Sequence, residues 1–350
     1  MSNFSYENSG VDINTANRTK EEMRAILETS EKRVLNRLGA FASLYDIEFP
    51  AFRHPVLVLK TEEPGSKQLL AFQHDKIEGV CYDMINHLIN DCIVMGAIPL
   101  SVQDCIVCGR LEQDKVKRIV KGIAAACREQ GCVLTGGETS EQPGVIPAGT
   151  YILTSSIVGI AEKEDIIDGS AIREGDIVLG LASSGLHTNG YSLVRKLLKE
   201  IPGLESSMVG NRTFIEEILT PHRCYYNTVK GLFGKNLVQG MAHITGGGIR
   251  ENLNRILPVT LNAEIVLDHY RVLPVFRAIR EAGSLQDVEM LRTFNLGVGM
   301  AVVVKKEYSR DIIQYVKERN VECYEIGSIV KGSGEVVLKG KLSWEQPEQT

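Results

Sequence analysis

Three residues in the segment Tyr82–Asp91 are spaced so that they could act together on a metal ion. Read as a helix, the segment places Asp83, His87 and Asp91 at positions i, i+4 and i+8, and each step drifts by only about 40° around the axis. Two carboxylates on one face of an otherwise apolar helix are costly to bury without a cation. A hard divalent ion that carries nucleotide phosphates would supply one. The alternative is a solvated acidic edge beside a structural histidine, and the helix alone does not decide between the two.

Three polar, glycine-rich segments are predicted to join a strand to a following helix. They are Gly136–Glu141, Ser183–Gly190 and Thr245–Gly248. Glycines let backbone N–H groups converge on an anion, and the helix N-terminus behind them adds a partial positive charge. Each segment alone fits an ordinary turn, but three of them, together with acids suited to Mg²⁺, favour a nucleotide or sugar-phosphate site. None has the Walker or dinucleotide-binding spacing, which argues against a P-loop enzyme and a Rossmann dehydrogenase.

His187 is the histidine whose position favours chemistry. It lies in a loop between Ser184 and Asn189 and not on an apolar face, so a core role is the less natural interpretation. Its titration range suits a general acid/base or a phosphate contact. His243, beside the triple glycine, fits similar work or simple packing. Four further histidines are interpreted as surface or structural residues: His54, His74, His222 and His269.

Composition indicates a soluble globular protein. The 350 residues suffice for two domains, and 43% hydrophobic with 24% charged residues is ordinary for such proteins. The net charge of -5 argues against a nucleic-acid surface. No apolar run approaches membrane-spanning length, and the start MSNFSYENSG has no secretory pattern. Eight scattered cysteines, including Cys105 and Cys108, are interpreted as structural thiols of a reducing compartment. We therefore expect a cytoplasmic protein with neither a membrane nor a nucleic-acid partner.

The N-terminal half is predicted to be an α+β domain with the order β-α-β-α-β-β. Its strands are Pro55–Lys60, Ser101–Cys108, Cys132–Thr135 and Thr150–Ala161, and its helices lie around Tyr82–Asp91 and at Gln113–Gln130. Thr61–Lys67 is interpreted as a turn, and Lys20–Leu38 has helical spacing. Such a sheet is covered by helices on one face, so its other face needs a partner domain or a second subunit.

The turn-rich segment Ile166–Asp176 is the predicted boundary between domains 1–168 and 169–350. Strands are then predicted at Ile177–Ala182, Ala242–Thr245, Leu261–Leu267, Val298–Val304, Cys323–Ile329 and Glu335–Leu338. Helices are predicted at Tyr191–Glu200, Phe214–Leu219, His222–Phe233, Ile249–Ile256, Val272–Ala282 and Tyr308–Arg319.

Several of these segments carry a resemblance to a known family. They read SGVDINTAN, DMINHLIND with MGAIPL, TGGETSEQPG, IIDGS, SSGLHTNGYSLVRK, HITGGGIREN and MLRTFNLGVGM. In order and spacing, over about residues 6–330, the chain resembles the phosphoribosylformylglycinamidine cyclo-ligases, also called aminoimidazole ribonucleotide synthetases. The resemblance implies an ATP- and Mg²⁺-dependent ligase of purine biosynthesis that closes an imidazole ring on formylglycinamidine ribonucleotide. It also implies an α+β N-terminal domain that binds ATP and pairs with its twin in a barrel-like homodimer, followed by an α/β C-terminal domain.

The resemblance also implies roles for single residues of this chain. Metal binding falls on Glu62, Asp83 and Asp91, and catalysis on Asp12, Arg24 and His187. Ligand binding falls in addition on Lys67, Glu138, Asn189, Gly246, Gly247 and Gly248, with the three glycines assigned by hypothesis to the substrate phosphate.

Three departures from the family pattern bear on these roles. The chain has TEEPGSK where the family usually has TDGVGTK, so Glu62 replaces an aspartate and Pro64 removes one N–H group from a phosphate cradle. Arg24 stands where a lysine is usual, which changes the donor geometry. His87 stands at a usually apolar place.

These departures leave two other functions open. One is another ATP-dependent member of the superfamily, such as thiamine-monophosphate kinase, selenophosphate synthetase or a hydrogenase-maturation dehydratase. The last two rely on a reactive cysteine in a terminal segment, whereas the C-terminal region here offers only Cys323, within a strand pattern. The other is a paralogue that binds nucleotide without turnover.

Overall fold

A computed structural model describes residues 18–19, 21–23, 26–27, 31–36 and 40–345. It divides the chain into two units, the first formed by Met1–Cys92 with Ala97–Lys163 and the second by Ile93–Gly96 with Glu164–Thr350. Asp12 and Arg24, which the resemblance makes catalytic, lie outside the described residues. Apart from the short segment Ile93–Gly96, the change from the first unit to the second falls between Lys163 and Glu164.

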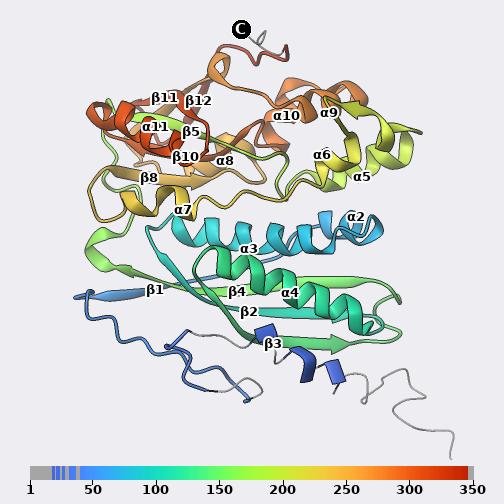
Figure 1. Ribbon diagram of the computed structural model, residues 1–350. Helices are drawn as coiled ribbons and strands as arrows, with labels where there is room; N and C mark the ends of the chain where they lie inside the picture. Colours follow the sequence, from blue (N-terminus) through green and yellow to red (C-terminus); the bar gives the residue numbers. More distant parts are fainter. Residues whose placement is uncertain (1–17, 20, 24–25, 28–30, 37–39, 346–350) are drawn as a thin grey trace, which may run out of the picture. The chain divides into compact units, whose positions relative to one another are not determined.

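The described residues of the first unit form a four-stranded sheet with the order β1-β4-β2-β3 (Figure 1). Strands β1 (Pro55–Glu62) and β2 (Ile98–Cys108) both pair antiparallel with β4 (Tyr151–Glu162). Strand β3 (Val133–Glu141) pairs parallel with β2. A parallel pair needs a crossover, and helix α4 (Gln113–Glu129) supplies it.

Helices α3 (Ile77–Ile93) and α4 cover one face of this sheet (Figure 1). The apolar side of α3 is fully buried, and its buried residues include Met84, Ile85, Leu88 and Ile89. A short helix, α2 (Lys67–Gln73), comes before α3. The first unit therefore confirms the predicted α+β fold, with a sheet covered by helices on one face.

The period-two alternation of β1 sorts its side chains between the two faces of the sheet. Lys60 and Glu62 lie on the face toward α3, where both contact its side chains. Leu57 and Leu59 point to the opposite face and are 49% and 69% exposed. Ile98 and Ile152 are exposed as well. An exposed apolar sheet face marks an interaction surface, and this is the face for which the sequence predicts a covering partner.

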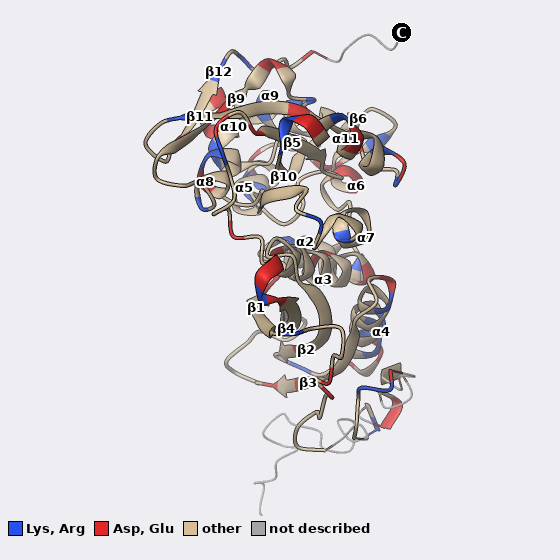
Figure 2. Ribbon diagram, turned by 90° about the vertical axis from the view of Figure 1, so that its left-hand side faces the viewer, with Lys and Arg blue, Asp and Glu red and all other residues tan. Residues whose placement is uncertain are grey.

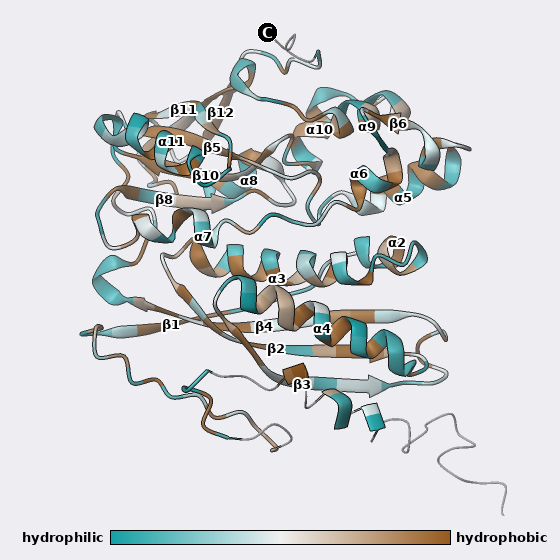
Figure 3. Ribbon diagram, viewed as in Figure 1, coloured by the Kyte–Doolittle hydropathy of each residue, from teal (hydrophilic) through white to brown (hydrophobic). Residues whose placement is uncertain are grey.

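The second unit is built on a six-stranded sheet in its described part, with the order β12-β9-β11-β5-β10-β8. Its strands are β5 (Ile177–Ala182), β8 (Val238–His243), β9 (Leu261–Val266), β10 (Val298–Val304), β11 (Cys323–Lys331) and β12 (Val336–Lys339). All neighbours pair antiparallel except β9 and β12. Strand β10 is buried along its whole length and is among the most hydrophobic segments (Figure 3).

Helices accompany this sheet, so the second unit is a mixture of α and β structure, as predicted. They are α5 (Tyr191–Glu200), α6 (Phe214–Ile218), α7 (Tyr226–Val229), α8 (Gly248–Asn254), α9 (Pro274–Gly283), α10 (Asp287–Thr293) and α11 (Ser309–Lys317). A two-stranded ribbon pairs β6 (Met208–Val209) with β7 (Arg212–Thr213). Basic and acidic residues are interspersed along both units (Figure 2). None of the described helices has the length and hydrophobicity needed to span a membrane.

Three predictions about local structure are wrong, and a fourth holds only in part. Gly136–Glu141 is not a strand-to-helix junction, because it extends β3 and pairs with β2. Thr61–Lys67 is not one turn, because β1 continues through Glu62 and α2 begins at Lys67. The helix predicted at His222–Phe233 is reduced to α7 and one 3-10 turn. The helix predicted at Lys20–Leu38 is confirmed at residues 21–23 and 26–27 but does not extend to Val34, which forms an isolated bridge with Tyr45.

Candidate active site

Strand β1 and helix α3 bring four charged or polar side chains together in the first unit. Lys60 Nζ lies 2.7 Å from Glu62 Oε1 and 3.1 Å from Asp91 Oδ2. His87 Nε2 lies 3.7 Å from Asp91 Oδ2 and 4.0 Å from Glu62 Oε1. The structure thus brings together Glu62 and Asp91, two of the three predicted metal ligands. We call Lys60, Glu62, His87 and Asp91 the β1–α3 cluster.

The β1–α3 cluster favours a charged lysine. Partial burial alone would lower the pKa of Lys60, but hydrogen bonds and charge interactions with Glu62 and Asp91 outweigh it and raise the pKa above its ordinary value. An ammonium is therefore held between two carboxylates. A hard divalent ion at the same position would have an oxygen from each carboxylate within reach, so Glu62 and Asp91 fit a Mg²⁺ site.

Asp83 does not share the β1–α3 cluster. Its Oδ1 lies 2.7 Å from Nζ of Lys67, the first residue of α2, and the two side chains are 1% and 0% exposed. Burial lowers the pKa of Lys67 although Asp83 opposes the shift. The shared helix face predicted from the i, i+4 and i+8 spacing holds for His87 and Asp91, whereas Asp83 is engaged by a lysine from another helix.

Glu138 lies at the other edge of the sheet from Glu62. It is exposed on β3, and its Oε1 accepts a hydrogen bond from the Thr139 amide at 2.9 Å. Strands β4 and β2 lie between β1 and β3, so the separation is about 14 Å at about 4.8 Å per strand. Within one unit, Glu138 does not join Glu62 and Asp91 around a single ion.

Asp104 is a buried carboxyl that the sequence analysis did not single out. It lies on β2 at a core-facing position between Val102 and Ile106, and burial raises its pKa to about 7. A side chain at Gly137 on β3 would clash with the Asp104 carboxylate. The available signal was an acidic residue at a core-facing position of the alternating strand pattern.

In the second unit, two of the predicted glycine-rich loops lie at the same end of the strands. Strands β5 and β8 are both antiparallel to β10 and so run in the same direction. The loops that follow their carboxyl ends therefore lie on the same side of the sheet. A Cβ atom added to Gly246 would lie 3.4 Å from Asn189 Oδ1. The structure therefore brings Asn189 of the first loop to Gly246 of the second.

The loop Thr245–Gly248 is held in shape by Asn252 of α8. Its Nδ2 donates to the carbonyl oxygens of Thr245, Gly246 and Gly248, at 3.3, 3.1 and 2.8 Å. Gly247 and Gly248 have φ angles of 91° and 61°, a region that favours glycine. Any side chain at Gly248 would clash with the Leu291 carbonyl oxygen. At Gly248, therefore, glycine is required by packing.

Asn295, just before β10, fixes the loop Ser183–Gly190 and was also missed. Its Oδ1 accepts a hydrogen bond from the Ser183 hydroxyl at 2.9 Å, and its Nδ2 donates to the Gly185 carbonyl at 2.9 Å. The amide of Gly297 donates to the same Oδ1 at 2.9 Å. A lone asparagine within the segment MLRTFNLGVGM gave no local sign of this role, because the two loop residues that it holds, Ser183 and Gly185, lie more than a hundred residues away in the sequence.

His187 is buried, at 1% exposed, so the inference that its loop position keeps it out of the core is wrong. Its Nε2 accepts a hydrogen bond from the Ser184 amide at 3.2 Å, which places the proton of a neutral ring on Nδ1. Its ring stacks on that of His222, with centroids 3.8 Å apart and planes at 18°. The φ angle of 62° at His187 is set by this tight loop. Its predicted catalytic role stays a prediction.

His222 and His243 complete a buried histidine cluster, with their Nε2 atoms 3.0 Å apart. Both side chains are buried, which agrees with the structural interpretation of His222 and leaves the role of His243 a prediction. The rings of His187 and His222 are nearly parallel, and one nitrogen of each of the three histidines lies within 4.8 Å of those of the other two, so the three side chains form a group that could hold a metal ion. His187 ties the loop Ser183–Gly190 to this cluster through the hydrogen bond from the Ser184 amide and the stack on His222.

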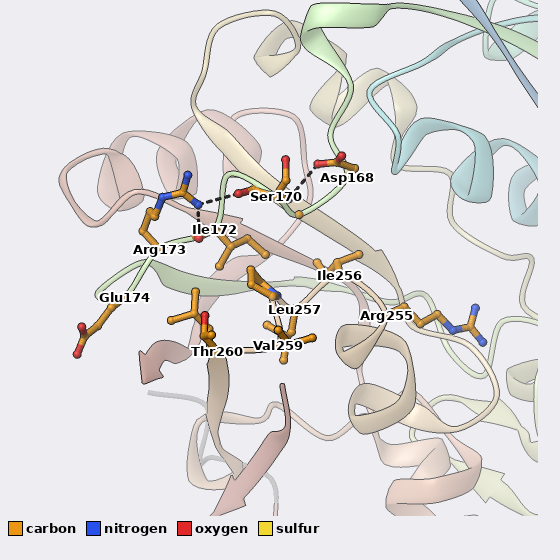
Figure 4. A pocket seen from close by; sticks show the side chains of 13 residues that line it. Asp168, Ser170, Ile172, Arg173, Glu174, Arg255, Ile256, Leu257, Val259 and Thr260 are labelled. Atoms are coloured by element: carbon orange, nitrogen blue, oxygen red, sulfur yellow. Dashed lines mark hydrogen bonds between the residues drawn. The ribbon is translucent and has the colours of Figure 1, made fainter. Parts of the chain in front are cut away.

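A separate cavity of about 590 Å³ lies in the second unit, between the turn Ile166–Asp176 and the segment joining α8 to β9 (Figure 4). None of the predicted site residues lines it. Arg173 donates to the carbonyl oxygens of Ser170 and Ile172 at 2.7 Å each. The charged ends of Arg173, Glu174 and Arg255 point apart and not toward a common ligand (Figure 4).

Comparisons with known proteins support the resemblance along most of the chain. Models of the AIR synthase related protein match twice, the N-terminal domain at residues 52–161 and the C-terminal domain at residues 173–339. A phosphoribosylformylglycinamidine cyclo-ligase of Bacillus mycoides (strain KBAB4) is 41% identical over 339 residues, which cover 96% of this chain and 98% of the relative.

Two solved structures share the fold at low sequence identity. Thiamine-monophosphate kinase from Stenotrophomonas maltophilia K279a is 16% identical with a TM-score of 0.64, covering 92% of this chain and 96% of that one. Hydrogenase maturation protein HypE in complex with ATP is 15% identical with a TM-score of 0.63, covering 92% and 90%. At such identities these structures show the fold alone, whereas the sequence relatives show the family. The chain belongs to the phosphoribosylformylglycinamidine cyclo-ligase family.

Proposed function

We propose that this protein is a ligase that converts formylglycinamidine ribonucleotide to 5-aminoimidazole ribonucleotide, with ATP giving ADP and phosphate, in de novo purine biosynthesis. The observation that carries the proposal is the 41% identity to a phosphoribosylformylglycinamidine cyclo-ligase across 96% of the chain. Both glycine-rich loops of the second unit and the carboxylates of the β1–α3 cluster are consistent with phosphate and metal ligands.

The reaction needs positioning and charge neutralisation more than a protein nucleophile. ATP transfers its terminal phosphoryl group to the formamide oxygen of the substrate. An amidine nitrogen then attacks that carbon, a C–N bond closes the imidazole ring, and the C–O bond breaks as phosphate leaves with the former formamide oxygen. Mg²⁺ held by Glu62 and Asp91 would neutralise the phosphates during the transfer.

The first unit binds ATP in this proposal. The β1–α3 cluster binds the phosphates and the metal ion, and Lys67 is assigned to the same ATP site with its ammonium buried against Asp83. Hydrogenase maturation protein HypE, which has a similar fold, has a structure in complex with ATP, and this supports the assignment. Asp83 orients Lys67 through their buried ion pair. Glu138, at the far sheet edge, contacts a different part of a ligand or a ligand held by a twin subunit.

The second unit binds the ribonucleotide substrate in this proposal. The loop Thr245–Gly248 binds the substrate phosphate beside Asn189, whose Oδ1 lies against Gly246. The amides of Gly247 and Gly248 donate to the carbonyl oxygens of Arg292 and Thr245 at 3.0 and 3.1 Å, so the phosphate contact falls on the N–H group of Gly246. His187, together with Asp12 and Arg24 outside the described residues, is assigned to catalysis. Because His187 is buried, we infer that it acts by positioning the loop Ser183–Gly190. It holds this loop through the hydrogen bond from the Ser184 amide and the stack on His222.

The exposed apolar face of the first sheet supports a homodimer. Leu57, Leu59, Ile98 and Ile152 form its exposed apolar residues, and a second copy would bury them. A cytoplasmic location for this dimer fits the free thiols of all eight cysteines.

A changed substrate is the second candidate, favoured by Glu62–Pro64 and by the lysine within the β1–α3 cluster. The purified protein should be assayed with ATP and Mg²⁺ against formylglycinamidine ribonucleotide and thiamine monophosphate in parallel. Substrate carrying ¹⁸O in its formyl group should yield ¹⁸O-labelled phosphate. Turnover of thiamine monophosphate alone, or unlabelled phosphate, would reject the cyclo-ligase proposal.

A further inference from the structure

We propose that Lys60 competes with the divalent metal ion for Glu62 and Asp91, and thereby sets the metal requirement of the nucleotide site. The inference rests on the proposed function insofar as it takes this cluster as the metal site. It concerns a residue of this chain that neither the family resemblance nor the carried-over site residues include. Its basis is the position of one ammonium group between the two carboxylates predicted to hold the ion.

The lysine and a metal ion cannot share these oxygens. Lys60 Nζ is 2.7 Å from Glu62 Oε1 and 3.1 Å from Asp91 Oδ2, and Mg²⁺ binds carboxylate oxygens at about 2.1 Å. An ion bridging the same two oxygens would occupy the volume that the ammonium now fills. Two cations at that spacing also repel each other. Metal binding therefore requires the Lys60 side chain to leave.

Lys60 has a route by which to leave. Its side chain is 36% exposed, whereas those of Glu62 and Asp91 are 22% and 19% exposed. The four-carbon stem of a lysine is also flexible. Lys67 shows the opposite arrangement, because its side chain is fully buried against Asp83. Of these two lysines, Lys60 is the displaceable one and Lys67 the fixed one.

The competition has a measurable consequence in the absence of nucleotide. A metal ion that binds here must break two partly exposed ion pairs. Two pairs of this kind together weaken the binding constant of the ion by a factor on the order of ten. Removing the ammonium should therefore tighten metal binding by about that factor. His87, whose Nε2 lies 3.7 Å from Asp91 Oδ2, is left unchanged in these variants.

The test is a titration of the full chain with Mn²⁺ alone, followed by electron paramagnetic resonance and calorimetry. Lys60→Met should bind one Mn²⁺ about tenfold more tightly than the unmodified protein, and Lys60→Gln should do the same. Lys60→Arg keeps the positive charge and should show no gain. Lys115→Met is the matched control, because Lys115 pairs with Glu112 at 2.9 Å on the surface of α4.

The double variant Lys60→Met with Asp91→Asn ties the gain to this site. Loss of the added affinity in the double variant supports the proposal. Equal Mn²⁺ affinity in Lys60→Met, Lys60→Gln and the unmodified protein, or a gain that survives Asp91→Asn, would overturn it. Because neither ATP nor ribonucleotide is present, the result does not depend on cyclisation activity, which fails or succeeds in a separate assay.

Discussion

Lys67 Nζ and Asp83 Oδ1 lie 2.7 Å apart in an ion pair that is almost completely closed to solvent, with side-chain exposures of 0% and 1%. The pair joins the first residue of α2 to α3. Burying two charges is costly, and the cost is offset only while both partners are present. The pair therefore fixes the start of α2, directly after the divergent segment TEEPGSK, at the point where ATP phosphates are proposed to bind.

Removing one partner of this pair should destabilise the first unit strongly. We expect Asp83→Asn to lower the free energy of unfolding by about 3–5 kcal/mol, because it leaves the Lys67 ammonium buried without a counter-charge. The double variant Asp83→Leu with Lys67→Met, which removes both charges, should recover most of the loss. Urea unfolding of the three proteins measures both effects. A single-variant loss below about 1 kcal/mol would contradict the account.

Asp104 should make stability fall as the pH rises. Its folded pKa of about 7 exceeds the unfolded value of about 3.9, so the folded state binds more protons between these values and loses stability as the pH increases through them. From pH 5.5 to 7.5 the loss is about 2 kcal/mol.

The Asp104→Asn variant should flatten this pH dependence, as measured by urea unfolding at both pH values. Asp114→Asn, on the exposed surface of α4, is the matched control and should keep the slope of the unmodified protein. If the free energy of unfolding changes equally with pH in Asp104→Asn and in the unmodified protein, the pH dependence comes from other groups.

Regular elements with a clear period could be predicted well from the sequence. The apolar spacing of α4 and the glycine after it predict Gln113–Gln130, and the helix runs over Gln113–Glu129. The alternation of β1 is equally clear. By contrast, GGETSE carries turn residues, but backbone pairing with β2 makes it part of a strand. Pairing between distant segments overrides local preference there.

The partners of the site residues were less predictable than their positions. Two helical steps of about 40° turn Asp83 about 80° away from Asp91, which is enough for Lys67 of α2 to engage one and Lys60 of β1 the other. Asn295 acts on the loop Ser183–Gly190 through contacts that no local pattern encodes. The sequence therefore predicts which segments carry the site, and the structure supplies which side chains neutralise each other.

Asp91→Asn should nearly abolish activity that depends on Mg²⁺ and ATP. The amide keeps the shape of the side chain but removes one of the two carboxylates available to the ion, so we expect kcat/KM to fall roughly a hundredfold or more. Steady-state kinetics at saturating Mg²⁺ measures the effect, with unfolding temperature as the check on folding. Turnover within threefold of the unmodified protein would refute the metal role.

His187→Ala should lower kcat roughly a hundredfold while ATP affinity changes less than twofold. His187→Asn is the informative companion, because asparagine tolerates the φ angle of 62° but cannot provide the ring stacked on His222. If the imidazole is needed, both variants lose kcat. An unchanged kcat in both would leave His187 as a structural residue only.

Gly246→Ala tests the proposed phosphate-binding role of the loop Thr245–Gly248 more directly than a substitution at Gly247. Its added Cβ would lie 3.4 Å from Asn189 Oδ1 and meets ordinary packing, whereas Gly247 has a φ of 91° and would be strained by any side chain. We expect a KM for the ribonucleotide about tenfold higher, with the KM for ATP unchanged. A bulky residue at Gly247 should raise the same KM, at an added cost in stability. Two unchanged KM values would remove the loop from the substrate site.

The most direct measurement of the proposed function is the stoichiometry of the complete reaction. Purified protein, ATP, Mg²⁺ and formylglycinamidine ribonucleotide are combined, and phosphate and 5-aminoimidazole ribonucleotide are followed in the same samples. We expect phosphate release that requires the ribonucleotide and equals product formation one to one. ATP binding with no ribonucleotide-dependent phosphate release, or release without the aminoimidazole product, would contradict it.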